Sequence, residues 1–327
     1  MTESDRLIDV FDARIKRRDE RRAFFKTAIG AAAVGAALAM PLDAAAQSAA
    51  PSDPDILNFA LNLEYLEAQF YAYAANGTGL AGNLLTGSGT QGTVNGGRQV
   101  NFTDPVVRQY AREIAADEVA HVAFLRGALG SAAVAMPAID IGVGPNTAFS
   151  GAARAAGLIG AGATFDPYAN DENFLLGAFI FEDVGVTAYK GASPLITNTT
   201  YLDAAAGILA VEAFHAGLIR NALYAKGIGA STLRTASEAI SNARDTLDGA
   251  ANLDQGVATQ TVPYVNANGT TVNVQVSNIA PTDANGIAFS RTPAQVLNIV
   301  YLTAGTSASS GGFFPNGVNG TLRTTAA

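Results

Sequence analysis

The chain has 327 residues, a net charge of −8, two histidines and no cysteine. The lack of cysteine excludes disulfides, thiol catalysis, iron–sulfur clusters and cysteine-ligated zinc. The acidic balance argues against nucleic acid as a partner, because binding phosphates needs a basic face. Hydrophobic residues make up 49% of the chain, which predicts that most of it folds.

The first 46 residues have the order of a secretory signal. A basic stretch over 14–26 is followed by an Ala- and Gly-rich apolar run over 28–40 and by small residues. That run of about 13 residues is shorter than the ~20 that span a bilayer. Arg21-Arg22 resembles a twin-arginine signal, although Glu20 stands where Ser or Thr is usual. We expect export to the periplasm or cell envelope, cleavage near residue 46 and no membrane span afterwards; the alternative is a basic amphipathic helix.

Four long helices are predicted next. Capping residues, Pro or acidic residues mark their starts, and apolar residues recur along them at helical spacing. The predicted ranges are 55–75, 103–129, 170–191 and 200–225. The segment 76–99, rich in Gly, Thr, Ser and Asn, is predicted to be a loop, and 130–170 a long connection with one short helix.

The last hundred residues differ in composition. We expect a fifth helix over 231–247, a β-hairpin with strands at 261–265 and 270–276, and a sixth helix over 291–302. The expected domains are a signal peptide over 1–46, a four-helix bundle over 53–228 and a C-terminal extension over 229–327 packed on the bundle.

Both histidines follow a glutamate by three residues. The two motifs are Glu118-Val119-Ala120-His121 and Glu212-Ala213-Phe214-His215. Residues three apart in a helix lie on one face, so each motif presents a carboxylate and an imidazole together. Apolar residues surround both motifs, and we therefore expect them to be buried.

Glu182 interrupts an apolar stretch of the third long helix. The run 174–186 carries almost no other charge. A lone buried carboxylate is strongly unfavourable unless it is paired, protonated or bound to a metal. Glu182 is therefore a candidate for the same site as the two histidine motifs.

The first long helix offers two candidate acids, Glu64 and Glu67. Tyr71 follows Glu64 by seven residues, just as Tyr189 follows Glu182. Position 67 aligns instead with a glycine. This short internal repeat favours Glu64 as the equivalent of Glu182.

One glutamate on each of two helices and Glu-x-x-His on each of the other two is the di-iron or dimanganese pattern of helical bundles. With these residues the chain resembles the ferritin-like superfamily, and within it the exported ferritin-like proteins grouped with plant desiccation-related proteins. The resemblance covers about 53–227. It implies an all-α fold, a ferritin-like four-helix bundle followed by the C-terminal extension.

The resemblance also implies two divalent metal ions. Oxygen-rich ligation with one imidazole per metal suits iron or manganese better than zinc. Glu118 and Glu212 would bridge the two metals. His121 and His215 would each ligate one metal, and Glu64 and Glu182 would be terminal ligands.

Four further residues are predicted to support the ligands from outside. They are Glu67, Asp117, Tyr71 and Tyr189. Asp117, directly before Glu118, stands where this superfamily often keeps the hydrogen-bond partner of a ligating histidine. Val211 occupies the equivalent position before Glu212 and cannot play that role, so the two metals need not be equivalent. Simpler alternatives are a surface acid for Asp117, a solvent-facing charge for Glu67, core aromatics for the tyrosines, and a metal-free polar layer for the whole cluster.

Three functions remain open. The leading hypothesis is a redox-active dimetal protein of the cell envelope that oxidises Fe(II) or reduces peroxide or O₂, with oxidative stress as its setting. A manganese catalase-like activity is a separate hypothesis. No catalytic residue is predicted beyond the metal ligands. The alternative is a non-catalytic stress- or desiccation-related protein with a structural or vestigial site. The expected partners are a metal ion and a small-molecule oxidant, with no nucleic acid; further copies of the chain remain an option.

Overall fold

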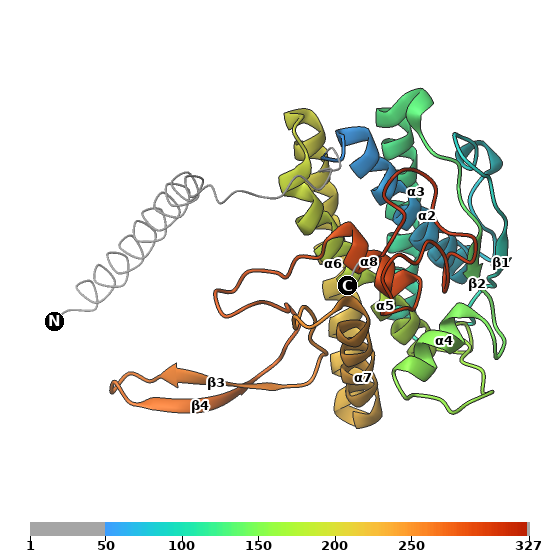
Figure 1. Cartoon of the computed structure of the whole chain (residues 1–327). Coiled ribbons are helices and arrows are strands. Elements are labelled where there is room, and N and C mark those ends of the chain that lie inside the picture. The colour runs from blue at the N-terminus through green and yellow to red at the C-terminus, as the bar shows by residue number, and fades with distance from the viewer. Residues whose placement is uncertain (1–49, 326–327) are drawn as a thin grey trace, which may run out of the picture. The chain divides into compact units, whose positions relative to one another are not determined.

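The computed structural model describes residues 50–325. Its frame is built from four long helices, α2 (Asp53–Asn76), α3 (Pro105–Leu129), α5 (Asp171–Ala192) and α6 (Thr199–Gly229). α2 packs along α3, α5 packs along α6, and contacts from α2 to α5 and from α3 to α6 join the two pairs (Figure 1). The predicted four-helix bundle is confirmed. The predicted signal, residues 1–46, lies outside the described residues.

Side-chain caps set the starts of these helices. Ser52 and Asp55 form a capping box at α2, the carboxylate of Asp104 accepts the N–H groups of the first turn of α3, and Asn170 caps α5. Such caps satisfy backbone N–H groups that the helix itself leaves unpaired. Gly77 ends α2 in the left-handed region at φ 77°, which glycine adopts without strain.

The connections contain more structure than the sequence predicted. β1 (Val94–Gly96) pairs in parallel with β2 (Ile139–Ile141), and short 3₁₀ turns, η1 (Gly82–Leu84) and η2 (Gly130–Ala132), flank the strands. The expectation of an uninterrupted loop over 76–99 is therefore wrong. Strands of three residues are too short to give a readable alternation of side chains. The predicted short helix of the second connection is α4 (Ala148–Ala155).

The extension begins directly after the bundle. α7 (Ser231–Asp248) packs against α5 and α6, and α8 (Pro293–Val300) packs against α5 and α7. Between them the chain forms the antiparallel hairpin of β3 (Gln260–Val265) and β4 (Thr271–Val276). A further 3₁₀ turn, η3 (Ser193–Leu195), joins α5 to α6.

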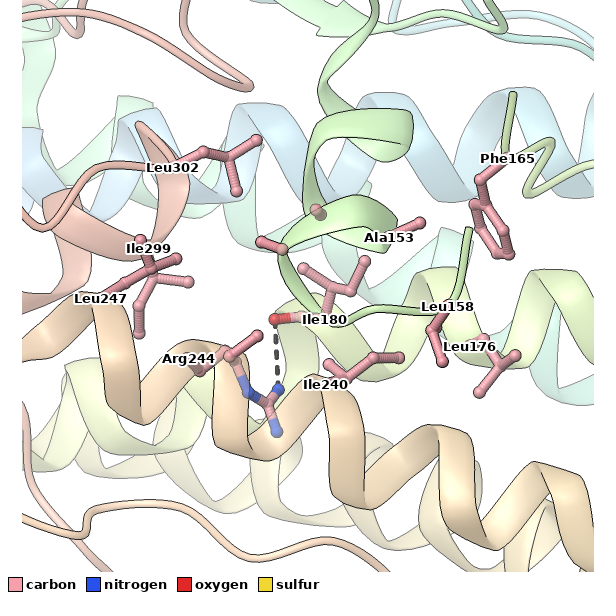
Figure 2. A pocket seen from close by; sticks show the side chains of 13 residues that line it. Ala153, Leu158, Phe165, Leu176, Ile180, Ile240, Arg244, Leu247, Ile299 and Leu302 are labelled. Carbon is pink, nitrogen blue, oxygen red and sulfur yellow. Dashed lines mark hydrogen bonds between the residues drawn. The ribbon is translucent and has the colours of Figure 1, made fainter. Parts of the chain in front are cut away.

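An apolar seam joins the extension to the bundle. Figure 2 shows Ile180 of α5, Ile240 and Leu247 of α7 and Ile299 of α8 around a cavity of about 20 Å³. Burying a side chain of this size contributes about 1.5–3 kcal/mol. In the same view Arg244 donates a hydrogen bond to the carbonyl oxygen of Ile180, at 3.3 Å.

One helix among residues 50–325, α6, is long and apolar enough to cross a bilayer. It is a helix of the bundle, and the side chains of Glu212, His215 and Arg220 are buried on its inner side. Its length and hydropathy follow from an inner face that packs and an outer face that is uncharged between Asp203 and Lys226.

Asp183 pairs two buried arginines at the back of α5. Its Oδ2 accepts hydrogen bonds from Arg220 Nη1 at 2.7 Å and from Arg244 Nη2 at 3.1 Å. Arg220 is on α6 and Arg244 on α7, and both side chains are buried. One carboxylate of α5 therefore ties α6 to α7, the first helix of the extension.

A second carboxylate carries this network to α8. Asp254 lies 2.6 Å from Arg244 Nε and 3.1 Å from Arg291 Nη2. Arg291, just before α8, also pairs with Asp248 at 2.6 Å. No sequence pattern assigned Arg291 a role, and the structure makes it the buried anchor of the end of the extension.

Removing the carboxylate of Asp183 should destabilise the fold strongly. In Asp183→Ala two buried guanidinium groups lose a shared partner, and breaking a buried ion pair costs about 3–5 kcal/mol. Urea unfolding measures the difference in the free energy of unfolding. Asp203→Ala, at an exposed acid of α6, is the control and should change it little; a loss below ~1 kcal/mol in Asp183→Ala would contradict the role of the network.

Candidate metal centre

Four glutamates and two histidines converge inside the bundle. The structure brings together all six residues predicted as ligands. They are Glu64 of α2, Glu118 and His121 of α3, Glu182 of α5, and Glu212 and His215 of α6. Five are at most 2% exposed, and His121 is 8% exposed. The helical spacing of the two histidine motifs thus puts both on the inner face.

The first ligand group surrounds His121. Its Nδ1 lies 3.2 Å from Glu64 Oε2 and 3.7 Å from both Glu118 Oε2 and Glu212 Oε1. One ligand atom from each of these four residues lies within 4.8 Å of the others. This is the spacing that a single metal ion requires of its donors.

The second ligand group surrounds His215. Its Nδ1 lies 3.1 Å from Glu118 Oε1 and 3.8 Å from Glu182 Oε2, and these three residues form a second group within 4.8 Å. The two oxygens of Glu118 therefore face different groups, as a bridging carboxylate must. Glu212 belongs to the first group only, so its bridging role stays a prediction.

The two tyrosines bond across the bundle. Tyr71 of α2 donates to Oε1 of Glu182 on α5, and Tyr189 of α5 donates to Oε1 of Glu64 on α2. Each tyrosine follows one glutamate by seven residues and fixes the carboxylate of the other helix. The repeat in the sequence therefore corresponds to a reciprocal pair of contacts, and both tyrosines are more than core aromatics.

The histidines differ in their outer partners. His215 Nε2 donates to Oδ2 of Asp117 at 3.1 Å, which leaves Nδ1 directed at the carboxylates. The Asp117 side chain is 45% exposed, so this acid is both at the surface and a partner of the histidine. The ion-pair contacts of His121 within residues 50–325 all involve Nδ1. The asymmetry expected from Val211 is therefore visible in the structure.

Glu67 lies inside the bundle, and the solvent-facing alternative is wrong. It is 5% exposed. A Cβ added at Gly185 would lie 3.4 Å from Glu67 Oε1 and only 2.2 Å from Glu212 Oε2. The glycine of α5 thus provides the space that both carboxylates use. In the internal repeat of the sequence, position 67 aligns with Gly185, but that alignment did not indicate that the two residues lie close together.

Burial controls the charge of this cluster. It raises the pKa of Glu182 to about 8. Burial, reinforced by neighbouring carboxylates, also raises the pKa values of Glu118, Glu212 and Glu67 well above the usual range. For Glu64 burial acts in the same direction, but the hydrogen bond to His121 and its charge lower the pKa on balance. Without a cation, most of these acids would have to hold protons.

Several atoms of the cluster that could ligate a metal have no hydrogen-bond partner. Both oxygens of Glu118 and of Glu212, Oε2 of Glu182 and Nδ1 of His215 are buried without a hydrogen bond. Each such orphan typically costs about 1–3 kcal/mol. Carboxylate oxygens and imidazole nitrogens at this spacing are suitable ligands for a divalent metal, which would satisfy all of these atoms.

Comparison with known proteins agrees with this geometry. Residues 52–225 match the family model of the ferritin-like domain. The chain belongs to the ferritin-like family. A desiccation-related protein of Craterostigma plantagineum is 31% identical over 252 residues, covering 75% of this chain and 76% of that protein. A ferritin-like catalase of Nesocodon mauritianus is 30% identical over 280 residues, covering 83% and 85%. No solved structure matches the chain.

Alanine at the two kinds of glutamate should distinguish bridging from terminal ligation. Glu118→Ala should remove all bound metal, because its oxygens face both groups, whereas Glu182→Ala should remove about half. Elemental analysis of the purified proteins gives the metal content per chain. Glu172→Ala, at an acid of α5 outside the cluster, is the control. Loss of only half the metal in Glu118→Ala would show that Glu118 is not a bridge.

A methyl group at Gly185 should weaken metal binding although no ligand is replaced. In Gly185→Ala the new Cβ displaces the carboxylate of Glu212, and we expect a loss of ~10-fold or more in Mn(II) affinity, as for other residues that orient ligands. Calorimetric titration measures it. Gly127→Ala in α3 is the matched control, since its Cβ would meet no atom within 4 Å. Equal affinities in the two variants would contradict the close packing of Glu212 on α5.

Proposed function

We propose that this chain is an exported protein with a dinuclear iron or manganese centre that acts on peroxide. The observation that carries the proposal is the set of buried, unpartnered carboxylate oxygens and imidazole nitrogen that converge from four helices. A purely structural core has no use for acceptors that lack hydrogen-bond donors. Two adjacent cations would neutralise the carboxylates and hold the four helices together.

A bound pair of iron or manganese ions supplies reversible two-electron exchange. In disproportionation, one peroxide is reduced to two waters while a second is oxidised to O₂. The protein has three tasks here: Tyr71 and Tyr189 fix the orientation of the terminal carboxylates, Asp117 fixes the tautomer of His215, and the packed bundle excludes bulk water.

The exposure of the ligands indicates where a small substrate arrives. His121 is the most exposed of the six, and Asp117 beside the cluster is partly exposed. Both lie on α3, on the side where it faces α6. We infer that peroxide approaches between α3 and α6.

The names of the two relatives support two candidates. The one named a ferritin-like catalase favours peroxide over Fe(II) as substrate. The name of the desiccation-related relative favours a second candidate, a non-catalytic role in stress tolerance with a structural metal site.

Peroxide consumption by chain loaded with Mn, Fe or redox-inert Zn tests the activity. The proposal predicts turnover with Mn or Fe, one O₂ released per two peroxides, and none with Zn or with Glu118→Ala. Glu172→Ala should retain the activity. Metal binding without turnover would favour the structural role, and Fe(II) oxidation without peroxide turnover would make the protein a ferroxidase.

Export is part of the same proposal. The basic stretch, apolar run and small residues before residue 47 should direct the chain out of the cytoplasm. N-terminal sequencing of the envelope fraction should give a mature protein that begins near Gln47, and Arg21→Lys with Arg22→Lys should keep the precursor inside. An intact Met1 on protein that stays in the cytoplasm would overturn the assignment.

A further inference from the structure

Two uncharged apolar surfaces have no partner within residues 50–325. One is a face of the β3–β4 hairpin, which we call the arm. The other is the outer face of α6. Neither surface belongs to the metal centre, so an inference drawn from them does not depend on the proposed function.

The arm is amphipathic. Its register pairs Val262 with Val274 and Tyr264 with Val272, and directly paired residues point to the same face of a sheet. That face thus carries five apolar side chains and Gln260, whereas the opposite face carries four polar side chains together with Pro263 and Val265. Tyr264 is 56% and Val272 39% exposed. A two-stranded hairpin is marginal in water unless it packs on a helix or further strands, and Figure 1 shows no third strand beside it.

The outer face of α6 is equally unusual. Phe214 is 73% exposed, and the residues around it on this face, Ala206, Gly207, Ala210 and Gly217, are small. From 204 to 225 every side chain that is not buried is uncharged. Small residues let a sheet approach the helix closely, and a large aromatic ring among them provides an anchor.

Charge indicates which partner these surfaces fit. The chain has a net charge of −8, yet no charged residue occurs from 255 to 282. Uncharged faces allow two copies of an acidic protein to meet without repulsion. A membrane surface is the other apolar candidate, but interfacial segments that bind lipid usually surround their apolar face with Lys and Arg. Neither surface has them.

We propose that the arm packs its apolar face on the outer face of α6 in a second copy of this chain. The sizes agree: strands of this length extend ~20 Å, and α6 from Ala206 to Gly217 extends ~18 Å. Two paired strands are about as wide as one helix. Because each copy has both surfaces, a twofold axis makes the contact twice, and each arm covers the partner's α6.

Charged substitutions on the two faces of the arm test the contact. The full chain should sediment with the mass of two chains, and Val272→Glu should sediment as one chain. Asn273→Glu places the same charge one residue away on the opposite face of the arm and should remain a dimer. A monomeric wild-type chain, or a dimer that survives Val272→Glu, overturns the proposal. So does a monomer that floats with neutral lipid vesicles and loses this property in Val272→Glu, since the arm would then bind membrane.

The receiving surface needs its own test. Phe214→Glu should dissociate the dimer, and combining it with Val272→Lys should restore association by pairing opposite charges. If Phe214→Glu stays dimeric while Val272→Glu does not, the arms pair with each other and the proposal is wrong.

The lack of native cysteine allows a direct readout of proximity. A chain with Val274→Cys and a second chain with Ala210→Cys, differing in mass by a tag, should form a mixed disulfide when combined and oxidised. Val143→Cys, at an exposed residue outside both surfaces, is the control and should not crosslink with either. Equal crosslinking of the control would contradict the assignment.

Discussion

Four carboxylates that share one buried space are the constraint on which the rest of this structure depends. Like charges this close cannot all ionise in a low-dielectric interior, and protonating them leaves acceptor atoms without donors. The helices position the ligand atoms but give them no hydrogen-bond partners: both oxygens of Glu118 and of Glu212 lack them. The proposed metal pair resolves both problems at once, and its binding energy would hold the four helices together around this polar cluster.

Around this centre four of the six ligands are positioned from a different helix. Tyr71 and Tyr189 cross between α2 and α5, Asp117 on α3 holds His215 on α6, and Gly185 makes room for Glu212. No helix can rotate without disturbing a ligand on its neighbour. The arginine network lies on the other side of the same elements: Asp183 follows Glu182 directly and points to Arg220 and Arg244. The extension therefore braces the helix segment that carries one of the ligands.

The sequence allowed the centre to be predicted because its chemistry is local. The spacing Glu-x-x-His and the seven-residue step from glutamate to tyrosine are properties of one helix at a time. Contacts that depend on tertiary placement were not predictable in the same way. Glu67 has the same helical environment whether it faces in or out, and only the glycine at 185 on another helix shows that it is buried. The partners of Arg291 lie 37 and 43 residues away, and the β1–β2 pairing involves three residues per strand.

Crystallography of the exported protein, with diffraction recorded at the iron and manganese absorption edges, tests the central claim most directly. The account predicts two anomalous peaks inside the bundle, one beside His121 and Glu64 and the other beside His215 and Glu182, with the carboxylate of Glu118 between them. A bundle with ordered glutamates, hydrogen-bonded to one another or to water, and no anomalous peak would contradict it.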